Sequence, residues 1–226
     1  PLVVCSIGNA AMTEGEVSEA LQMAVLKKLP ILYVVQDNDW NISANATETH
    51  VANAAEYAAG FPGLEAVSID GSDFETCWTT VERIVGTIRS ERRPFLLHAR
   101  VPLLNHHTSG VRKDWYRDDL QDHENRDPYP KLRALMLQKG WSEQELKATE
   151  AAAQATVAAD FEAAKAAADP LPQDLYDHAF APTPVTAEQG TRVPAGREPK
   201  MMVDCALFAV EELMRLHPEC VLYGQD

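Results

Sequence analysis

The sequence predicts an α/β fold in which a largely parallel sheet carries helices on both faces. Two observations lead to this prediction. Apolar, β-rich runs alternate with segments of helical periodicity, which is the order found in βαβ units. The run at 31–35 (ILYVV) is also apolar and β-rich throughout, as in strands that are buried on both faces, and 94–101 (PFLLHARV) is expected to form another strand. A helical segment, a linker and the start of a second α/β domain are expected after this sheet.

A βαβ unit is predicted at the start of the chain. The first apolar run ends at Gly8, where the backbone can turn sharply close to a ligand. Thr13 and Glu16 have the spacing of a capping box, so a helix is expected to begin there. Pro30 ends this helix before the strand at 31–35. The helix face that packs on the sheet is formed by Val17, Ala20, Leu21, Ala24 and Val25.

Further strands and helices continue the alternation. A polar loop follows Ser43, and a short helix is expected over 51–59. A strand at 65–70 (EAVSID) then leads into a longer helix. The apolar positions of that helix are Phe74, Cys77, Trp78, Val81, Ile84, Val85 and Ile88.

Oxygen-bearing side chains follow both strands of the first unit. Asn9 comes after the first strand, and Asp37, Asn38 and Asp39 come after the second. If the strands are neighbours, oxygens of Asn9 and Asn38 can converge on one hard cation such as Mg²⁺, which commonly carries phosphates. The helix N-terminus near Thr13 would offer backbone donors to those phosphates. The pattern predicts a metal–diphosphate site, and an ordinary strand–turn–helix unit without a ligand is the alternative.

The segment GNAAMTEGEVSEALQMAVLKKLPILYVVQDNDWNIS resembles the alpha region of 2-oxo acid dehydrogenases that use thiamine diphosphate. Such enzymes carry Gly-Asp-Gly after a strand and an Asn roughly thirty residues later. Here Gly8-Asn9-Ala10 and Asn38 hold these positions. The resemblance implies thiamine diphosphate and Mg²⁺, with metal ligands at the side chains of Asn9 and Asn38 and the carbonyl of Trp40. The implied cofactor-binding residues are Gly8, Asn9, Ala10, Ala11, Asn38, Ile42, His106 and His107.

Two residues depart from the family pattern. Asn9 replaces an acidic residue, so it offers an amide oxygen without the charge that a divalent cation favours. Asp37 or Asp39 is expected to restore some of that local negative charge. Ala10 replaces the second glycine, so the turn is expected to be one that a residue with a Cβ can adopt.

A second candidate site is the loop at 104–117 (LNHHTSGVRKDWYR). Histidine beyond the end of a strand suits phosphate binding or proton transfer near neutral pH. The loop resembles the family's active-site loop, which implies that His107 is catalytic, contacting the cofactor diphosphate and supporting acyl transfer to a lipoyl group. His106 matches the branched-chain type, and Leu103 replaces a family arginine. A structural or surface role is the alternative for the His-His pair.

Four parts of the chain are expected from these patterns. They are 1–126, the C-terminal part of an alpha-type thiamine diphosphate-binding domain; 127–169, a helical extension; 170–199, a proline-rich linker; and 200–226, the start of a beta-type domain with a helix and then a strand. In the extension, Ser142 and Glu145 predict a capping box for a helix reaching about Ala168. Its stripe, expected to pack in the core or on a subunit, is formed by Leu146, Ala153, Val157, Phe161, Ala164 and Ala168.

Composition narrows the class of protein. The formal net charge of −14 argues against nucleic-acid binding, and no segment has the uninterrupted apolar length of a membrane span. Cys5, Cys77, Cys205 and Cys220 have no paired spacing, so they are interpreted as buried free thiols of a reducing compartment, here the cytoplasm. Because both ends of the chain lie at apolar runs, it is interpreted as the middle of a longer polypeptide.

The resemblance also implies a function for the parent protein. It would oxidatively decarboxylate a 2-oxo acid and pass the acyl group to a lipoyl-bearing acyltransferase. The His-His-Thr-Ser loop favours a branched-chain, 3-methyl-2-oxobutanoate type of substrate, with pyruvate or acetoin as alternatives. Joined alpha-like and beta-like regions suggest a homodimer of fused chains in a multienzyme complex, and these 226 residues alone are expected to be inactive because the family's beta-region glutamate is not among them. A non-catalytic scaffold that keeps the fold is the alternative from another class, because Asn9 weakens the metal site.

Overall fold

The computed structural model describes residues 1–108, 110–177 and 198–222. The chain divides into two compact units, Pro1–Lys165 and Ala166–Asp226, and each is described by itself. The first unit holds the sheet and every predicted site residue.

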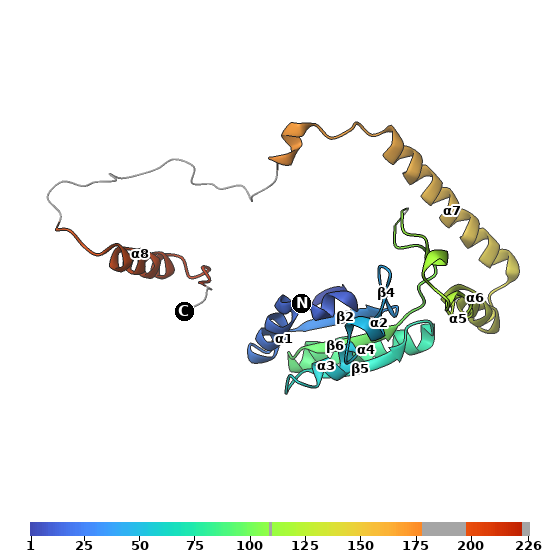
Figure 1. The fold of residues 1–226 in the computed structure, drawn as a ribbon, viewed down its shortest axis with the longest axis horizontal. Helices are drawn as coiled ribbons and strands as arrows, with labels where there is room; N and C mark the ends of the chain where they lie inside the picture. The colour runs from blue at the N-terminus through green and yellow to red at the C-terminus, as the bar shows by residue number, and fades with distance from the viewer. Residues whose placement is uncertain (109, 178–197, 223–226) are drawn as a thin grey trace. The chain divides into compact units, whose positions relative to one another are not determined.

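A four-stranded, wholly parallel sheet forms the centre of the first unit (Figure 1). Its strands stand in the order β1 (Val3–Gly8), β2 (Ile31–Asp37), β6 (Phe95–Arg100) and β5 (Glu65–Asp70). The predicted strands and the predicted adjacency of the first two are confirmed, with Gly8 opposite Gln36 in the register. All four carboxyl ends therefore lie along one edge of the sheet, which is where ligands bind in such folds.

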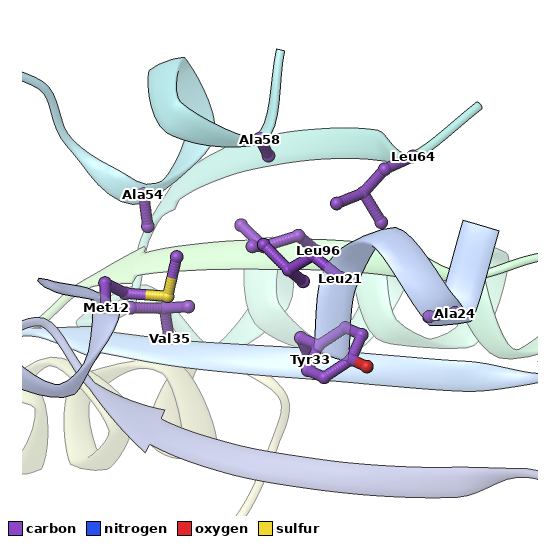
Figure 2. Packing of buried hydrophobic residues seen from close by; sticks show 9 residues of the cluster. All are labelled: Met12, Leu21, Ala24, Tyr33, Val35, Ala54, Ala58, Leu64 and Leu96. Atoms are coloured by element: carbon purple, nitrogen blue, oxygen red, sulfur yellow. The ribbon is translucent and has the colours of Figure 1, made fainter. Parts of the chain in front are cut away.

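Helices cover both faces of the sheet, which confirms the predicted fold class. Because successive side chains of a strand point to opposite faces, Leu96 and Leu97 of β6 lie in different buried clusters. Helices α1 (Gly15–Leu26) and α3 (Ala54–Ala58) pack on the Leu96 face, and α4 (Phe74–Glu91) packs on the other. Figure 2 shows the first cluster, which consists of Met12, Leu21, Ala24, Tyr33, Val35, Ala54, Ala58, Leu64 and Leu96.

The predicted helix faces are only partly buried. On α1, Leu21 and Ala24 are fully buried, whereas Ala20 is exposed. On α4, Ile84 and Ile88 are fully buried. The aromatic side chains Phe74 and Trp78 at the start of α4 are exposed and stack on each other, with 6.2 Å between ring centroids.

Helix α1 does not begin at the predicted capping box. Residues Ala10–Thr13 form a turn of 3-10 helix (η1), and the Thr13 hydroxyl donates to the carbonyl of Ala10 at 2.8 Å. Glu14 is the N-cap of α1, and its side chain makes no capping hydrogen bond. The predicted capping box of Thr13 and Glu16 is wrong because Thr13 belongs to the preceding 3-10 turn and the helix begins one residue later, with Glu14 as its N-cap.

The segment after β2 is more ordered than the predicted polar loop. A hairpin of β3 (Trp40–Asn41) and β4 (Ala44–Asn45) is followed by the short helix α2 (Ala46–Thr49). The predicted helix at 51–59 is the shorter α3. Both α2 and α3 begin with an Asn-x-x-Glu capping box in which the Asn side chain accepts from the helix backbone and the Glu side chain accepts from the Asn backbone.

Four further helical segments complete the first unit: η2 (Lys113–Trp115), α5 (Leu120–Glu124), α6 (Pro128–Gln138) and α7 (Glu143–Ala166). The predicted capping box of α7 is confirmed, because Ser142 N donates to Glu145 Oε2 at 2.8 Å and Glu145 N donates to Ser142 Oγ at 3.2 Å. Leu146 is buried, but the rest of the predicted stripe is exposed. The prediction that this stripe packs in the core is therefore wrong for the first unit. That it packs on another subunit stays a prediction.

The second unit contains η3 (Pro172–Leu175) and the predicted helix, α8 (Met202–Leu216). Residues 220–222 of the predicted strand form no strand, and residues 223–226 lie outside the described part. Most of the predicted linker, 178–197, also lies outside it.

The structure bears on the expected lack of a membrane span and on the expected state of the cysteines. None of the helices in the described residues is long and apolar enough to cross a bilayer. All four cysteines are free thiols, as predicted. Their predicted burial is wrong, because Cys5 and Cys77 are half-buried and Cys205 and Cys220 are exposed.

Candidate functional site

Asn9 lies directly beyond the carboxyl end of β1. Its backbone N–H donates to the carbonyl of Gln36 at 3.3 Å, which ties the turn to β2, and the residue is only 7% exposed. The residues with positive φ among those described do not include Gly8, Asn9 or Ala10. Ala10 in place of a glycine therefore fits this turn without backbone strain, as expected.

The end of β2 contains two Asx turns, in which a side-chain oxygen accepts a hydrogen bond from the backbone N–H two residues later. Asp37 Oδ1 accepts from the backbone N–H of Asp39, and Asn38 Oδ1 accepts from the backbone N–H of Trp40, both at 3.0 Å. Asp39 takes a φ of +66°, which Asp tolerates better than most residues. The Asn38 oxygen has a second lone pair, so it can hold this turn and still face a cation.

A pocket of about 210 Å³ opens beside these turns. Its polar lining residues are Asn9, Asp37, Asp39, Thr47, His50, Asn53 and Glu56, and the predicted ligand Asn38 is not among the lining residues. The volume is below the range of pockets that enclose a whole small molecule, but a cation with a phosphate group is much smaller. Three of the lining residues are carboxylates and none is Lys or Arg, so the pocket favours a cation over a bare anion.

A hydrogen-bonded chain centred on the buried His98 links three strands of the sheet and ends at Asp37, which lines the pocket. His98 on β6 is 2% exposed; its Nε2 lies 2.8 Å from Asp37 Oδ2, and its Nδ1 lies 2.9 Å from Ser68 Oγ on β5. The hydrogen bond from His98 holds the pKa of Asp37 below its ordinary value, against the opposing effect of burial, with further help from the Asp39 N–H. Asp37 therefore stays ionised at the pocket.

Asp37 should make the stability of the fold depend on acidity. Its folded pKa lies below its unfolded value of about 3.9, so its contribution is full above that value and is lost as pH falls through the folded pKa. We expect the melting temperature of the wild type to fall between about pH 5 and pH 3, and Asp37→Asn to show a flatter decline. The control is Asp160→Asn on the exposed surface of α7, which should follow the wild type.

Four side chains form a closed ring of hydrogen bonds at the pocket. Asn9 Nδ2 donates to Asn41 Oδ1 at 3.1 Å, and Asn41 Nδ2 donates to Thr49 Oγ1 at 2.6 Å. Thr49 Oγ1 lies 2.7 Å from His50 Nδ1. His50 Nε2 lies 2.9 Å from the backbone carbonyl oxygen of Asn9, which closes the ring. Asn41, Thr49 and His50 were not predicted as site residues.

Trp40 joins the two predicted site segments. Its indole Nε1 donates to Asp119 Oδ2 at 2.8 Å, and its ring meets the Tyr116 ring edge-on at 5.3 Å between centroids. The Arg117 guanidinium lies 5.4 Å from the Trp40 ring centroid. The far end of the 104–117 loop is thereby held against the turn that follows β2.

Arg117 is the buried centre of this contact. Its side chain is 0% exposed; Nε donates to Asp119 Oδ1 at 2.7 Å and Nη1 donates to the carbonyl of Leu103 at 2.8 Å. Burial acts to raise the pKa of Asp119, but the hydrogen bonds from Arg117 and Trp40 outweigh it, and the pKa lies below its ordinary value. Burial lowers the pKa of His123, with a further contribution from the Arg117 charge, which favours the neutral imidazole whose Nδ1 accepts from Leu103 N at 2.8 Å.

The two predicted histidines of the loop are not brought into the pocket. His106 Nδ1 accepts from the backbone N–H of Lys113 at 2.9 Å, which is a contact within the loop. His107 is exposed and makes no hydrogen bond to the described residues. Ser109 lies outside the described part of the chain. The roles of His106 and His107 stay predictions.

Ile42 stands at the tip of the β3–β4 hairpin with a φ of +58° and is half exposed. This conformation is a strained one for a β-branched residue, at a cost on the order of 1–3 kcal/mol. Strain of this kind is often retained where a residue serves a ligand. The predicted cofactor contact at Ile42 is compatible with that observation.

The residues at the pocket fit a divalent cation, and the end of β1 leaves room for a ligand of that cation. Among the described residues no three His, Cys, Asp or Glu side chains form a metal cluster, so a cation here would need amide or carbonyl oxygens in addition. Asn9 supplies an amide oxygen, and Asp37 and Asp39 supply charge nearby. A Cβ added to Gly8 would meet no atom within 4 Å, so the strand end leaves room for a ligand to approach the backbone.

Comparisons with known proteins place the chain in a family. Residues 1–173 match the family model for the dehydrogenase E1 component. Mouse 2-oxoisovalerate dehydrogenase subunit alpha, mitochondrial, is 25% identical over 191 residues, which are 81% of this chain and 42% of that protein. The pyruvate dehydrogenase E1 component subunit alpha of Rickettsia bellii is 24% identical over 177 residues, covering 77% and 54%. The 3-methyl-2-oxobutanoate dehydrogenase subunit alpha of Mycobacterium tuberculosis is 29% identical over 146 residues, covering 63% and 40%.

The matched part spans about half the length of these curated relatives. Among solved structures, transketolase from Campylobacter jejuni is similar with a TM-score of 0.39 and 24% identity, over 44% of this chain and 15% of that one. The family model covers most of this chain, including both candidate site segments. The chain therefore belongs to the dehydrogenase E1 component family.

Proposed function

We propose that the full-length protein is a thiamine diphosphate- and Mg²⁺-dependent 2-oxo acid dehydrogenase that oxidatively decarboxylates its substrate and transfers the acyl group to a lipoyl group of a partner acyltransferase. The observation that carries the proposal is the acidic pocket where Asn9 and the Asp37–Asp39 turn meet, in a chain of the dehydrogenase E1 component family. When bound, thiamine diphosphate would supply the electron sink for decarboxylation.

The metal would be held by Asn9 and Asn38 through their side chains and by Trp40 through its carbonyl. Asn9 and Asn38 each keep an oxygen lone pair for this role, and the Asx turn at Asn38 fixes the position of Trp40. Backbone groups of Gly8, Ala10 and Ala11 would line the diphosphate, and Ile42 would contact the cofactor from the hairpin tip. These assignments follow the family pattern residue by residue.

His107 would contact the cofactor diphosphate and support acyl transfer, with His106 beside it. The loop that carries them is anchored at its far end by Arg117 and Asp119 to Trp40, which is itself a proposed ligand residue. This anchor supports the proposal because it ties the loop to the turn that would hold the metal.

The substrate is proposed to be a branched-chain 2-oxo acid of the 3-methyl-2-oxobutanoate type. The His-His-Thr-Ser sequence at 106–109 supports this choice, and two of the relatives named above are dehydrogenases of 2-oxoisovalerate or 3-methyl-2-oxobutanoate. Pyruvate or acetoin is the second candidate, favoured by the pyruvate dehydrogenase relative. A homodimer of fused alpha–beta chains in the cytoplasm, working in a multienzyme complex, completes the proposal.

Calorimetric titration of the full-length protein with thiamine diphosphate and Mg²⁺ tests the function. We expect saturable binding that requires both components, since the acidic pocket would repel a bare diphosphate. Absence of binding heat would instead favour a non-catalytic scaffold that keeps the fold and its assembly surfaces. The departure from an acidic residue at Asn9 is what favours that second candidate.

Asn9→Asp is expected to tighten Mg²⁺ binding about tenfold, or about 1.4 kcal/mol, because a carboxylate adds charge to the ligand set. The same titration measures the change. The control is Gln154→Glu on the exposed surface of α7, which also replaces an amide by a carboxylate, at a residue that does not line the pocket. Equal affinity in the wild type and Asn9→Asp would remove Asn9 from the metal shell.

A further inference from the structure

Two backbone carbonyl oxygens face the ring of His50: that of Asn9 lies 2.9 Å from Nε2, and that of Ala46 lies 3.3 Å from Nδ1. The Asn9 contact is the shorter one and is the only hydrogen bond of Nε2 among the described residues. The backbone carbonyl oxygen of Asn9 can only accept, so His50 Nε2, at 2.9 Å, must carry a proton and donate to it. In a neutral imidazole the other nitrogen is then an acceptor. His50 Nδ1 therefore accepts from the hydroxyl of Thr49 at 2.7 Å.

The direction of the remaining hydrogen bonds follows. Thr49 has one hydroxyl proton, and His50 Nδ1 at 2.7 Å is a nearer acceptor for it than the carbonyl oxygens of Ala46 at 3.4 Å and Asn45 at 3.5 Å. Toward Asn41 the hydroxyl can then only accept. Asn41 must then turn its Nδ2 to Thr49 and its Oδ1 to Asn9. Asn9 can meet that oxygen only with its own Nδ2, and its Oδ1 makes no hydrogen bond to another described residue.

The opposite neutral tautomer of His50 is disfavoured by the same geometry. An unprotonated Nε2 would stand 2.9 Å from the carbonyl oxygen of Asn9, with two acceptors facing each other and no donor nearby to compensate. An unprotonated Nδ1 faces the carbonyl oxygen of Ala46 at the longer distance of 3.3 Å and has the Thr49 hydroxyl as a donor at 2.7 Å. Asn9 is almost fully buried, so solvent offers little compensation for that contact.

We propose that Asn41, Thr49 and His50 are positioning residues that hold the Asn9 amide with its Oδ1 available to a divalent cation in the pocket. The inference rests on the proposed function, in which that cation binds at Asn9. An amide has only one terminal atom that can ligate a metal, whereas either oxygen of a carboxylate can do so. The ring therefore supplies an orientation that Asn9 needs and that an acidic residue at the same position would not.

The inference is tested by measuring Mn²⁺ binding to the full-length protein in the presence of thiamine diphosphate, with electron paramagnetic resonance as the readout. Thr49→Val keeps the shape of the side chain and removes the hydroxyl, and we expect it to weaken Mn²⁺ binding about tenfold, as loss of an outer-shell partner commonly does. Thr49→Ser keeps the hydroxyl and should bind like the wild type. Thr79→Val is the matched control, because it removes a helical Thr hydroxyl, bonded to the carbonyl of Glu75 at 2.8 Å on α4, away from the pocket.

A double-mutant cycle separates positioning from general damage to the pocket. In the Asn9→Asp background either carboxylate oxygen can meet the cation, so Thr49→Val should cost less than about twofold in affinity. If Thr49→Val costs the same tenfold in both backgrounds, the hydroxyl supports the pocket and does not orient Asn9. That result would overturn the inference and leave the proposed function intact.

A second readout needs no metal. The ¹⁵N resonances of His50, recorded in mildly alkaline buffer, report which ring nitrogen carries the proton, and we expect Nε2. A proton on Nδ1 would reverse the ring and overturn the inference, whatever the metal does. If the wild type does not bind Mn²⁺ although His50 is protonated on Nε2, the proposed function is wrong. The positioning role of the ring is then wrong as well, because there is no cation for Asn9 to bind.

Discussion

Replacing Arg117 with alanine is expected to lower the free energy of unfolding by about 3 kcal/mol or more. The guanidinium is fully buried and forms an ion pair with Asp119 at 2.7 Å, so its loss leaves a carboxylate without its main partner. It also removes the hydrogen bond to the carbonyl of Leu103 and the contact with the Trp40 ring. Urea denaturation, monitored by circular dichroism, measures the change in the free energy of unfolding. We also expect the 104–117 loop to separate from the turn after β2.

A matched control lies five residues earlier. Arg112 pairs with Asp114 at the same sequence spacing as Arg117 with Asp119, but at 3.5 Å and with both side chains more than half exposed. Arg112→Ala should cost less than about 1 kcal/mol, because surface ion pairs contribute little. If both variants lose a similar amount of unfolding free energy, the burial of Arg117 does not contribute to the stability of the fold.

The strands and their parallel order follow directly from the sequence. The run at 31–35 is apolar throughout because β2 is covered on both faces, and that property is local enough to read along the chain. The placement of Asn9 and Asn38 at neighbouring strand ends is a consequence of β1 pairing with β2. This part of the candidate site was therefore predictable without coordinates.

The ring at Asn9 was not predictable in the same way. Asn9 and Asn41 are 32 residues apart, and Asn9 and His50 are 41 apart, so no local pattern links them. The signal that the sequence does contain is the Asn45–Glu48 capping box, which predicts the short helix α2 at whose end Thr49 lies. This capping box predicts the helix, but it does not predict which atoms the end of the helix contacts.

Periodicity identifies the face of a helix but not what covers it. Leu21 and Ala20 belong to the same predicted face of α1, yet only Leu21 is buried. On α7 the stripe that includes Val157 and Phe161 is exposed, although its spacing resembles that of a core helix. Whether such a stripe is covered depends on neighbouring elements, which a pattern within one helix does not specify.

Leu21→Ala is expected to lower the free energy of unfolding by about 3 kcal/mol. Leu21 is 0% exposed and belongs to the cluster that seats α1 on the sheet beside Tyr33 and Leu96 (Figure 2). Truncation removes buried apolar contacts and leaves a cavity in packing that cannot fully collapse. Because α1 follows the turn that carries Asn9, loosening this helix should also weaken the proposed cation binding measured by calorimetry.

Leu26→Ala is the internal control, since the two leucines belong to the same helix and Leu26 is 70% exposed. Ala has a slightly higher helix propensity than Leu, so neither substitution costs stability through propensity, and Leu26 is the last residue of α1, where this gain is smaller. Leu26→Ala should shift stability by about 0.5 kcal/mol or less. Equal effects at the two positions would mean that α1 is not held to the sheet by Leu21, and the turn at Asn9 would then lose its structural support.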